Sequence, residues 1–96
     1  MAFRLSKRAA SDLRIIYDRS VSEFGQRQVD KYVGQLQADI EYISEYPESV
    51  REQKSKRRLI RVLHSGSHVI AFVTEAPEQI LIIRLLHGRQ DWINIV

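Results

Sequence analysis

The stretch from Gln79 to His87, QILIIRLLH, decides the fold expected for this chain. Apolar side chains occupy both alternating positions between Ile80 and Leu86, interrupted only by Arg84, and strands that are buried on both faces have this pattern. The run is far too short to cross a membrane. We therefore predict that Ile80 to Leu86 is a central strand of a sheet, covered by a helix on one side.

Two further strands are expected upstream of this one. The segments 57–64 (RRLIRVLH) and 68–75 (HVIAFVTE) are rich in β-branched residues, and turn signals separate the three strands at 65–67 (SGS) and 76–79 (APEQ). Connections this short join antiparallel neighbours. A short fourth strand is predicted at 3–6 (FRLS), but the pattern does not give its place in the sheet.

Apolar residues recur at helical spacing through most of the first half of the chain. Ser6 is placed to cap a first helix, and Gly25 is placed to end it. A second helix is expected to end before Pro47, and residues 47–56 are expected to form a polar loop. Two largely apolar stripes recur at steps of three and four residues: Ala9, Leu13, Ile16, Tyr17, Ser20 and Phe24, then Val29, Tyr32, Val33, Leu36, Ile40 and Ile43. The fold class is therefore α+β with the order β-α-α-β-β-β. We expect a helical hairpin packed against an antiparallel sheet, with residues 1–96 forming one domain.

Charge is distributed unevenly along the chain, whose net charge is +3. Between Arg51 and His64 six basic residues accompany one acid, whereas five acids and one base lie between Val29 and Glu48. The basic segment indicates either a polyanionic or acidic partner, or simply a solvated loop. No segment has the pattern of a signal peptide, and cysteine is absent, so we expect a cytoplasmic protein that does not associate with membranes.

Few residues suggest catalysis or metal binding. His64 and His68 flank the SGS turn and could face one another, which is a weak metal signal, and no cofactor is expected. Arg61 and Arg84 lie within apolar runs, so each belongs either to a basic sheet face or to a structural ion pair with a helix carboxylate such as Asp12 or Asp39. A basic sheet face would be formed by Arg58, Arg61, Arg84, His87 and Arg89. Aromatic residues on the helical stripes are interpreted as core: Tyr17, Phe24 and Tyr32.

Several of these segments together resemble the ParE toxin family, within the RelE/ParE superfamily of type II toxin–antitoxin modules. The resemblance is strongest in DLRIIYDRSVSEFG at 12–25, RVLHSGSHVIAFV at 61–73 and the terminal RLLHGRQD at 84–91, and it extends from Phe3 to Trp92. It implies a toxin that inhibits DNA gyrase by binding it and that is neutralised by a ParD-type antitoxin, in a heterotetramer or larger complex. It implies neither an enzyme nor a protein that binds a specific DNA sequence.

The end of the chain is the expected recognition region. We predict that Arg84, His87, Arg89, Asp91 and Trp92 contact the target, and that Arg58 and Arg61 frame the same face for the target or the antitoxin. Asp91 is expected to orient Arg89 or Arg84 by a charge-assisted hydrogen bond. Trp92 has a second interpretation of equal weight, in which it folds back over the end of the core.

Two alternatives remain open at this point. The first is an mRNA-cleaving toxin of the RelE type, in which Lys54, Lys56 and Arg61 would correspond to basic residues of that branch. Against it, Gly88 occupies the position of an expected Arg, no Tyr follows Tyr46, and a continuing strand would turn Arg89 to the opposite face. The second alternative is an inactive homologue that only binds its antitoxin.

Overall fold

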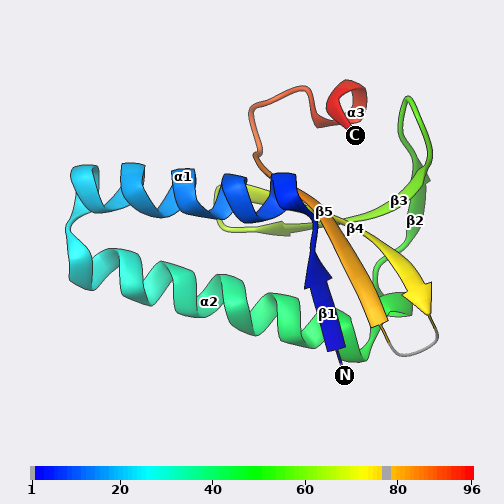
Figure 1. Ribbon diagram of the computed structural model, residues 1–96, viewed down its shortest axis with the longest axis horizontal. Coiled ribbons are helices and arrows are strands. Elements are labelled where there is room, and N and C mark those ends of the chain that lie inside the picture. Colours follow the sequence, from blue (N-terminus) through cyan, green and yellow to red (C-terminus); the bar gives the residue numbers. More distant parts are fainter. Residues whose placement is uncertain (1, 77–78) are drawn as a thin grey trace.

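The computed structural model describes residues 2–76 and 79–96 and has two long helices on one side of a five-stranded sheet (Figure 1). The APEQ turn includes positions 77–78, which lie outside the described residues. In chain order the elements are β1 (Ala2–Leu5), α1 (Lys7–Phe24), α2 (Gln26–Glu45), a 3-10 turn (Pro47–Ser49), β2 (Glu52–Lys54), β3 (Leu59–Ser65), β4 (His68–Ala76), β5 (Gln79–His87) and α3 (Trp92–Ile95). The predicted α+β class and the order of its main elements are confirmed.

The sheet is mixed rather than wholly antiparallel. Its strand order is β1-β5-β4-β3-β2, and β1 runs parallel to β5, so that Phe3 pairs with Ile80. The prediction that β5 is an interior strand is confirmed. The prediction of an antiparallel sheet is therefore wrong for β1, because alternating side chains give the same sequence pattern in parallel and antiparallel neighbours.

The polar loop predicted at 47–56 contains the edge strand β2. It pairs antiparallel with β3, with Glu52 opposite Arg61 and Lys54 opposite Leu59. Three polar residues give no alternation signal, which is why periodicity did not indicate this strand. The strand predicted from residue 57 begins at Leu59 instead, because residues 55–58 form the turn between β2 and β3.

Ser6 and Gly25 fix the two ends of α1 as predicted. The Ser6 hydroxyl accepts a hydrogen bond from the Ala9 N–H at 3.0 Å and donates one to the Ile83 carbonyl at 2.7 Å, so the cap also attaches the helix to β5. Gly25 has φ 86°, a value that side chains disfavour, and α2 begins at the next residue. The tight junction makes α1 and α2 an antiparallel hairpin (Figure 1).

The two faces of the sheet are covered by different elements. On one side, here called the helix face, α1 and α2 bury the larger core, which comprises Ala9, Leu36, Ile40, Ile43, Ile70, Phe72, Ile80, Ile82 and Leu85. On the other side, here called the tail face, the short α3 and the end of the chain cover a smaller core, which comprises Ile60, Val62, Val69, Ala71, Leu86 and Val96. Strand β5 contributes to both cores, as its two apolar faces predict.

A bulge in β5 changes which residues reach the helix face. Phe72 pairs with Ile82 and Ala71 with Arg84, which leaves Ile83 without a partner in β4. One inserted residue shifts the alternation by one position. Ile82 and Leu85, which are three residues apart, therefore both reach the helix-face core.

The helices extend beyond the sheet at the end where they join (Figure 1). Phe24 lies there with 59% of its surface exposed, so the prediction that it belongs to the core is wrong. Tyr17 and Tyr32 are half-buried. Among the described helices, none is both long and apolar enough to cross a membrane.

Candidate functional site

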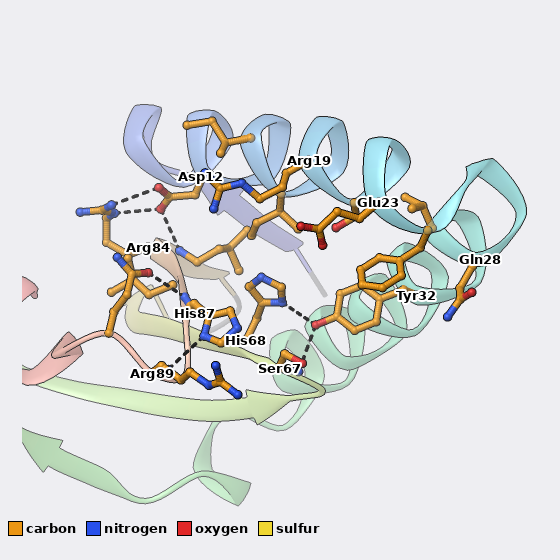
Figure 2. Close-up of a pocket in the computed structure, with 18 residues that line it drawn as sticks. Asp12, Arg19, Glu23, Gln28, Tyr32, Ser67, His68, Arg84, His87 and Arg89 are labelled. Atoms are coloured by element: carbon orange, nitrogen blue, oxygen red, sulfur yellow. Dashed lines mark hydrogen bonds and ion pairs between the residues drawn. The ribbon is translucent and has the colours of Figure 1, made fainter.

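A cleft of about 870 Å³ lies between the helical hairpin and the ends of β4 and β5 (Figure 2). Its apolar lining includes Ile15, Ile16, Phe24, Val29 and Leu85. Its polar lining is rich in basic and aromatic groups: Arg19, Tyr32, His68, Arg84, His87 and Arg89. An amphipathic cleft with several cations is suited to hold an apolar segment that carries acidic side chains.

Arg84 is held by Asp12 of α1. Its Nε lies 2.8 Å from Asp12 Oδ2 and its Nη2 lies 3.0 Å from Oδ1, while the Leu85 N–H donates to Oδ2 at 3.0 Å. The hydrogen bond to Asp12 raises the pKa of Arg84, and burial opposes that rise only in part. Of the two interpretations of Arg84, the structure supports the ion pair with a helix carboxylate. This pair joins α1 to β5 at the wall of the cleft.

Tyr32 of α2 holds the turn between β3 and β4. Its Oη lies 2.5 Å from His68 Nδ1 and 3.2 Å from the Ser65 carbonyl, and it accepts the Ser67 N–H at 3.3 Å (Figure 2). Burial raises the pKa of the Tyr32 phenol. Its ring packs directly on Gly66, where an added Cβ would lie 2.6 Å from Tyr32 Cε1 and where φ is +57°. Glycine is thus required at position 66 both by the backbone conformation and by the close packing of the Tyr32 ring.

The next group in the cleft is a pair of histidines. The rings of His68 and His87 lie 5.5 Å apart in an edge-on arrangement. Burial, and secondarily His87, lowers the pKa of His68, so it is neutral at physiological pH. His64 is exposed and pairs with Val69 on the tail face, so the expectation that it faces His68 is wrong. Within the described chain, no three metal-binding side chains gather in one place.

The chain turns at Gly88, and this turn brings Arg89 to the cleft. Strand β5 ends at His87, the Gly88 N–H donates to the Ser67 carbonyl at 2.8 Å, and the Gln90 N–H donates to the His87 carbonyl at 2.9 Å. The Arg89 N–H donates to His87 Nδ1 at 3.1 Å. Because the strand does not continue, alternation does not send Arg89 to the opposite face, and that sequence argument against RNA cleavage does not apply.

The five predicted target-binding residues are divided between two places. Arg84, His87 and Arg89 line the cleft, whereas Asp91 and Trp92 lie at the start of α3. Asp91 accepts a hydrogen bond from Asn94 Nδ2 and is not paired with Arg84 or Arg89. Trp92 is half-buried against the tail-face core, as its second interpretation predicted.

Arg58 and Arg61 do not line the cleft. Arg61 Nη1 donates to the Val50 carbonyl, and Asp39, the helix carboxylate that was a candidate partner, accepts a hydrogen bond from the Ser65 hydroxyl. Arg58 is exposed in the turn between β2 and β3. The basic sheet face is therefore not assembled, because Arg61 is engaged by the Val50 carbonyl whereas Arg84 is paired with Asp12 at the cleft.

Several residues that line the cleft were not predicted as functional. Tyr32 and Phe24 were interpreted as core because they continue a helical stripe, and Ile15 and Arg19 gave no signal beyond helical amphipathicity. The spacing between Tyr32 and the SGS turn is non-local, so no motif could have joined them. His68 was noticed only as a turn-flanking residue.

Residues 3–92 match the family model described as the ParE toxin of the type II toxin–antitoxin system parDE. The chain belongs to the ParE toxin family. Toxin ParE1 of Caulobacter vibrioides is 38% identical over 85 residues, which cover 88% of this chain and 86% of that protein. Toxin ParE1 of Mycobacterium tuberculosis is 29% identical over 89 residues, which cover 93% and 91%. This protein is therefore the toxin component of a type II toxin–antitoxin system.

A solved structure supports the same fold for this ParE-family toxin. A chain of the chromosomal ParDE TA system from P. aeruginosa superposes with a TM-score of 0.76 at 21% sequence identity, covering 91% of this chain and 95% of that one. At this identity the likeness establishes the fold. The helical hairpin and mixed sheet are thus the fold of that solved chain.

Proposed function

We propose that this toxin inhibits DNA gyrase by binding it, and that a ParD-type antitoxin neutralises the toxin by occupying the cleft. Membership of the ParE family over residues 3–92 is the observation that carries the proposal. The solved relative belongs to a ParDE system, which supports a complex with an antitoxin of that type.

The cleft has the chemistry that an antitoxin segment requires. Ile15 and Phe24 on its rim have 55% and 59% of their surfaces exposed, and exposed apolar side chains of this size favour a protein partner. Arg19 and Arg89 supply positive charge beside them. An amphipathic segment with acidic residues would bury the apolar rim and neutralise these cations.

The gyrase contact is assigned to the end of the chain, from Arg89 to Trp92. Arg and Trp are the residue types that most often dominate binding energy at interfaces. Arg84 has a structural task in its pair with Asp12, so we propose it as a positioning residue for β5 and not as a direct contact. Arg89 remains available for contact because its hydrogen bond to His87 Nδ1 uses only its backbone N–H.

The decisive experiment titrates the purified toxin into a supercoiling assay with purified gyrase. We expect loss of supercoiling or accumulation of cleaved DNA complexes. We expect Arg89→Ala to weaken this inhibition of gyrase by at least about tenfold. Arg27→Ala, which removes an exposed positive charge near the helical junction, is the matched control and should inhibit as well as the parent chain. If the parent chain neither inhibits gyrase nor traps a cleavage complex, the proposed target is wrong.

The two alternatives give distinct results in parallel assays. A RelE-type toxin would cleave ribosome-bound mRNA and lose that activity on substitution of Lys54, Lys56 and Arg61. The structure disfavours this, because Arg61 is engaged by the Val50 carbonyl and half-buried. An inactive homologue would bind its antitoxin tightly without arresting growth.

Antitoxin binding is tested separately by calorimetry with the co-encoded ParD-type protein. Ile15→Glu places a charge on the apolar rim and should reduce the affinity by at least about a hundredfold, since an unpaired charge would be buried on binding. Ile93→Glu alters a similarly exposed isoleucine on α3 and serves as the control. Equal affinities for the two variants would show that the antitoxin does not occupy the cleft.

A further inference from the structure

The basic segment at residues 51–58 is not used by the cleft or by the core. Its five cations, Arg51, Lys54, Lys56, Arg57 and Arg58, are all exposed. The two ion pairs found among the described residues, Arg4–Glu75 and Arg84–Asp12, lie elsewhere. Only Glu52 provides a carboxylate within the segment. Such a concentration of like charge is unfavourable for the isolated protein and becomes favourable only beside an anion.

The backbone beneath these cations is held without their help. Ser55, with 4% of its surface exposed, donates its N–H to the Arg58 carbonyl at 2.9 Å, and its Oγ accepts the Arg58 N–H at 3.3 Å. The Lys56 N–H donates to the Ile93 carbonyl at 3.0 Å, and Ser55 Oγ lies 2.9 Å from the Val96 carbonyl. The turn is therefore fastened to α3, and the cationic side chains have no structural task in it.

The position of the turn leaves it open to a large partner. Figure 1 shows the loop between β2 and β3 projecting beside α3, at the end of the molecule opposite the helical junction. The cleft lies between the helices and β4 and β5, and none of the five cations lines it. A partner bound at the basic segment would therefore leave the cleft accessible.

We propose that residues 51–58 form a sequence-independent contact to the phosphodiester backbone of a nucleic acid. Phosphate contacts require cations on flexible side chains and no pocket, which is what this segment offers. An acidic protein segment is the competing occupant, since Leu59 and Ile93 are exposed nearby, but five cations beside two apolar side chains favour a polyanion. The inference extends the proposed gyrase function, because gyrase acts on DNA, yet it concerns binding by the toxin alone.

The test measures fluorescence anisotropy of a labelled duplex of about 20 base pairs titrated with the intact toxin between about 50 and 200 mM salt. We expect affinity to fall steeply with salt, with a logarithmic slope of up to about −4.5 if all five cations contact phosphates. Two duplexes of unrelated sequence should bind equally, and single-stranded DNA and RNA of the same length distinguish the nucleic acid preferred.

The variant Lys56→Gln/Arg57→Gln/Arg58→Gln should weaken DNA binding by at least about tenfold. It should also make the logarithmic slope of affinity against salt concentration less steep by about 2 to 3. Its matched control is Arg8→Gln/Arg14→Gln/Arg27→Gln, which removes the same charge from exposed positions on the helices. Equal losses in the two variants would mean that net charge alone attracts DNA, and would overturn the proposal.

Two further results would also overturn it: no binding at the lowest salt concentration, or binding of an oligoglutamate peptide in preference to every nucleic acid. Thermal unfolding of both triple variants verifies that they fold. The outcome is separable from the gyrase assay. A toxin that inhibits gyrase without binding DNA retains the proposed function and loses this inference, and the reverse holds for one that binds DNA without inhibiting gyrase.

Discussion

The helix face and the tail face of the same sheet are built on different scales. On the helix face, α1 and α2 of 18 and 20 residues cover the larger core. The Asp12–Arg84 pair and the Tyr32 contacts to the SGS turn lie beside this core, at the cleft. On the tail face, α3 of four residues covers a smaller core and holds the basic turn in place. The helix face therefore contributes most of the stability and also forms the cleft. The tail face contributes less to stability and holds the exposed basic turn.

The largest expected difference between the faces comes from one matched pair of isoleucines. Ile70 on the helix face and Ile60 on the tail face are 0% and 1% exposed, on neighbouring strands. We expect Ile70→Ala to lower the free energy of unfolding by about 4 kcal/mol and Ile60→Ala by about 2 kcal/mol, because a short helix can collapse into a cavity more easily than two long ones. Urea unfolding of both variants measures this. Equal losses would show that α3 is as rigid a cover as the helical hairpin.

Gly66 gives the second largest effect, through the contact between α2 and the turn. Gly66→Ala should cost about 3 kcal/mol, because alanine is disfavoured at φ +57° and its Cβ would collide with the Tyr32 ring. Gly34→Ala is the control within α2, where an added Cβ meets nothing within 4 Å, and it should stabilise the protein by about 0.5 to 1 kcal/mol. Thermal melts of the two variants should thus shift in opposite directions.

The Asp12–Arg84 pair should matter more than the exposed pair across β1 and β4. Its side chains are 13% and 18% exposed, so Asp12→Asn should cost about 1 to 3 kcal/mol by leaving Arg84 without a full counter-charge. Arg4 and Glu75 are 56% and 31% exposed, and water already screens their attraction. Glu75→Gln should therefore leave the unfolding midpoint unchanged in the same urea titration, and a comparable loss there would contradict the distinction.

The smallest effect is the pH dependence that His68 confers on the helix face. Burial holds its pKa below the ordinary value of 6.5, so the unfolded chain takes up this proton before the folded protein does. Stability from this site is complete above pH 6.5 and is lost as pH falls from there through the lowered folded pKa. His68→Gln should reduce the slope of stability against pH in this window, which urea unfolding at several pH values measures. A slope that persists in His68→Gln would assign the proton to another group.

Part of the site could be predicted because its signals are local. Ser6 and Gly25 were recognised by the hydrogen-bond and backbone requirements of helix ends, and β5 by apolar residues on both faces. The pairing of Arg84 with a helix carboxylate was one of two interpretations, and only the bulge at Ile83 and the position of α1 decided it. Arg89 was grouped with Arg84 and His87 from the sequence, and all three line the cleft. Whether β5 continues past His87 was open in the sequence, and the structure ends the strand there, with the Gly88 N–H donating to the Ser67 carbonyl.

The sequence by itself determined the number and type of the main elements, the helical hairpin, the interior position of β5 and the family resemblance. These depend on periodicity, caps and turns within a few residues of one another. Only the tertiary structure decided that β1 is parallel to β5, that Tyr32 meets Gly66 and His68, and that Trp92 covers the tail face. Tyr32 and His68, for example, are more than 30 positions apart in the chain. Short-range patterns contain no information on which distant surfaces meet.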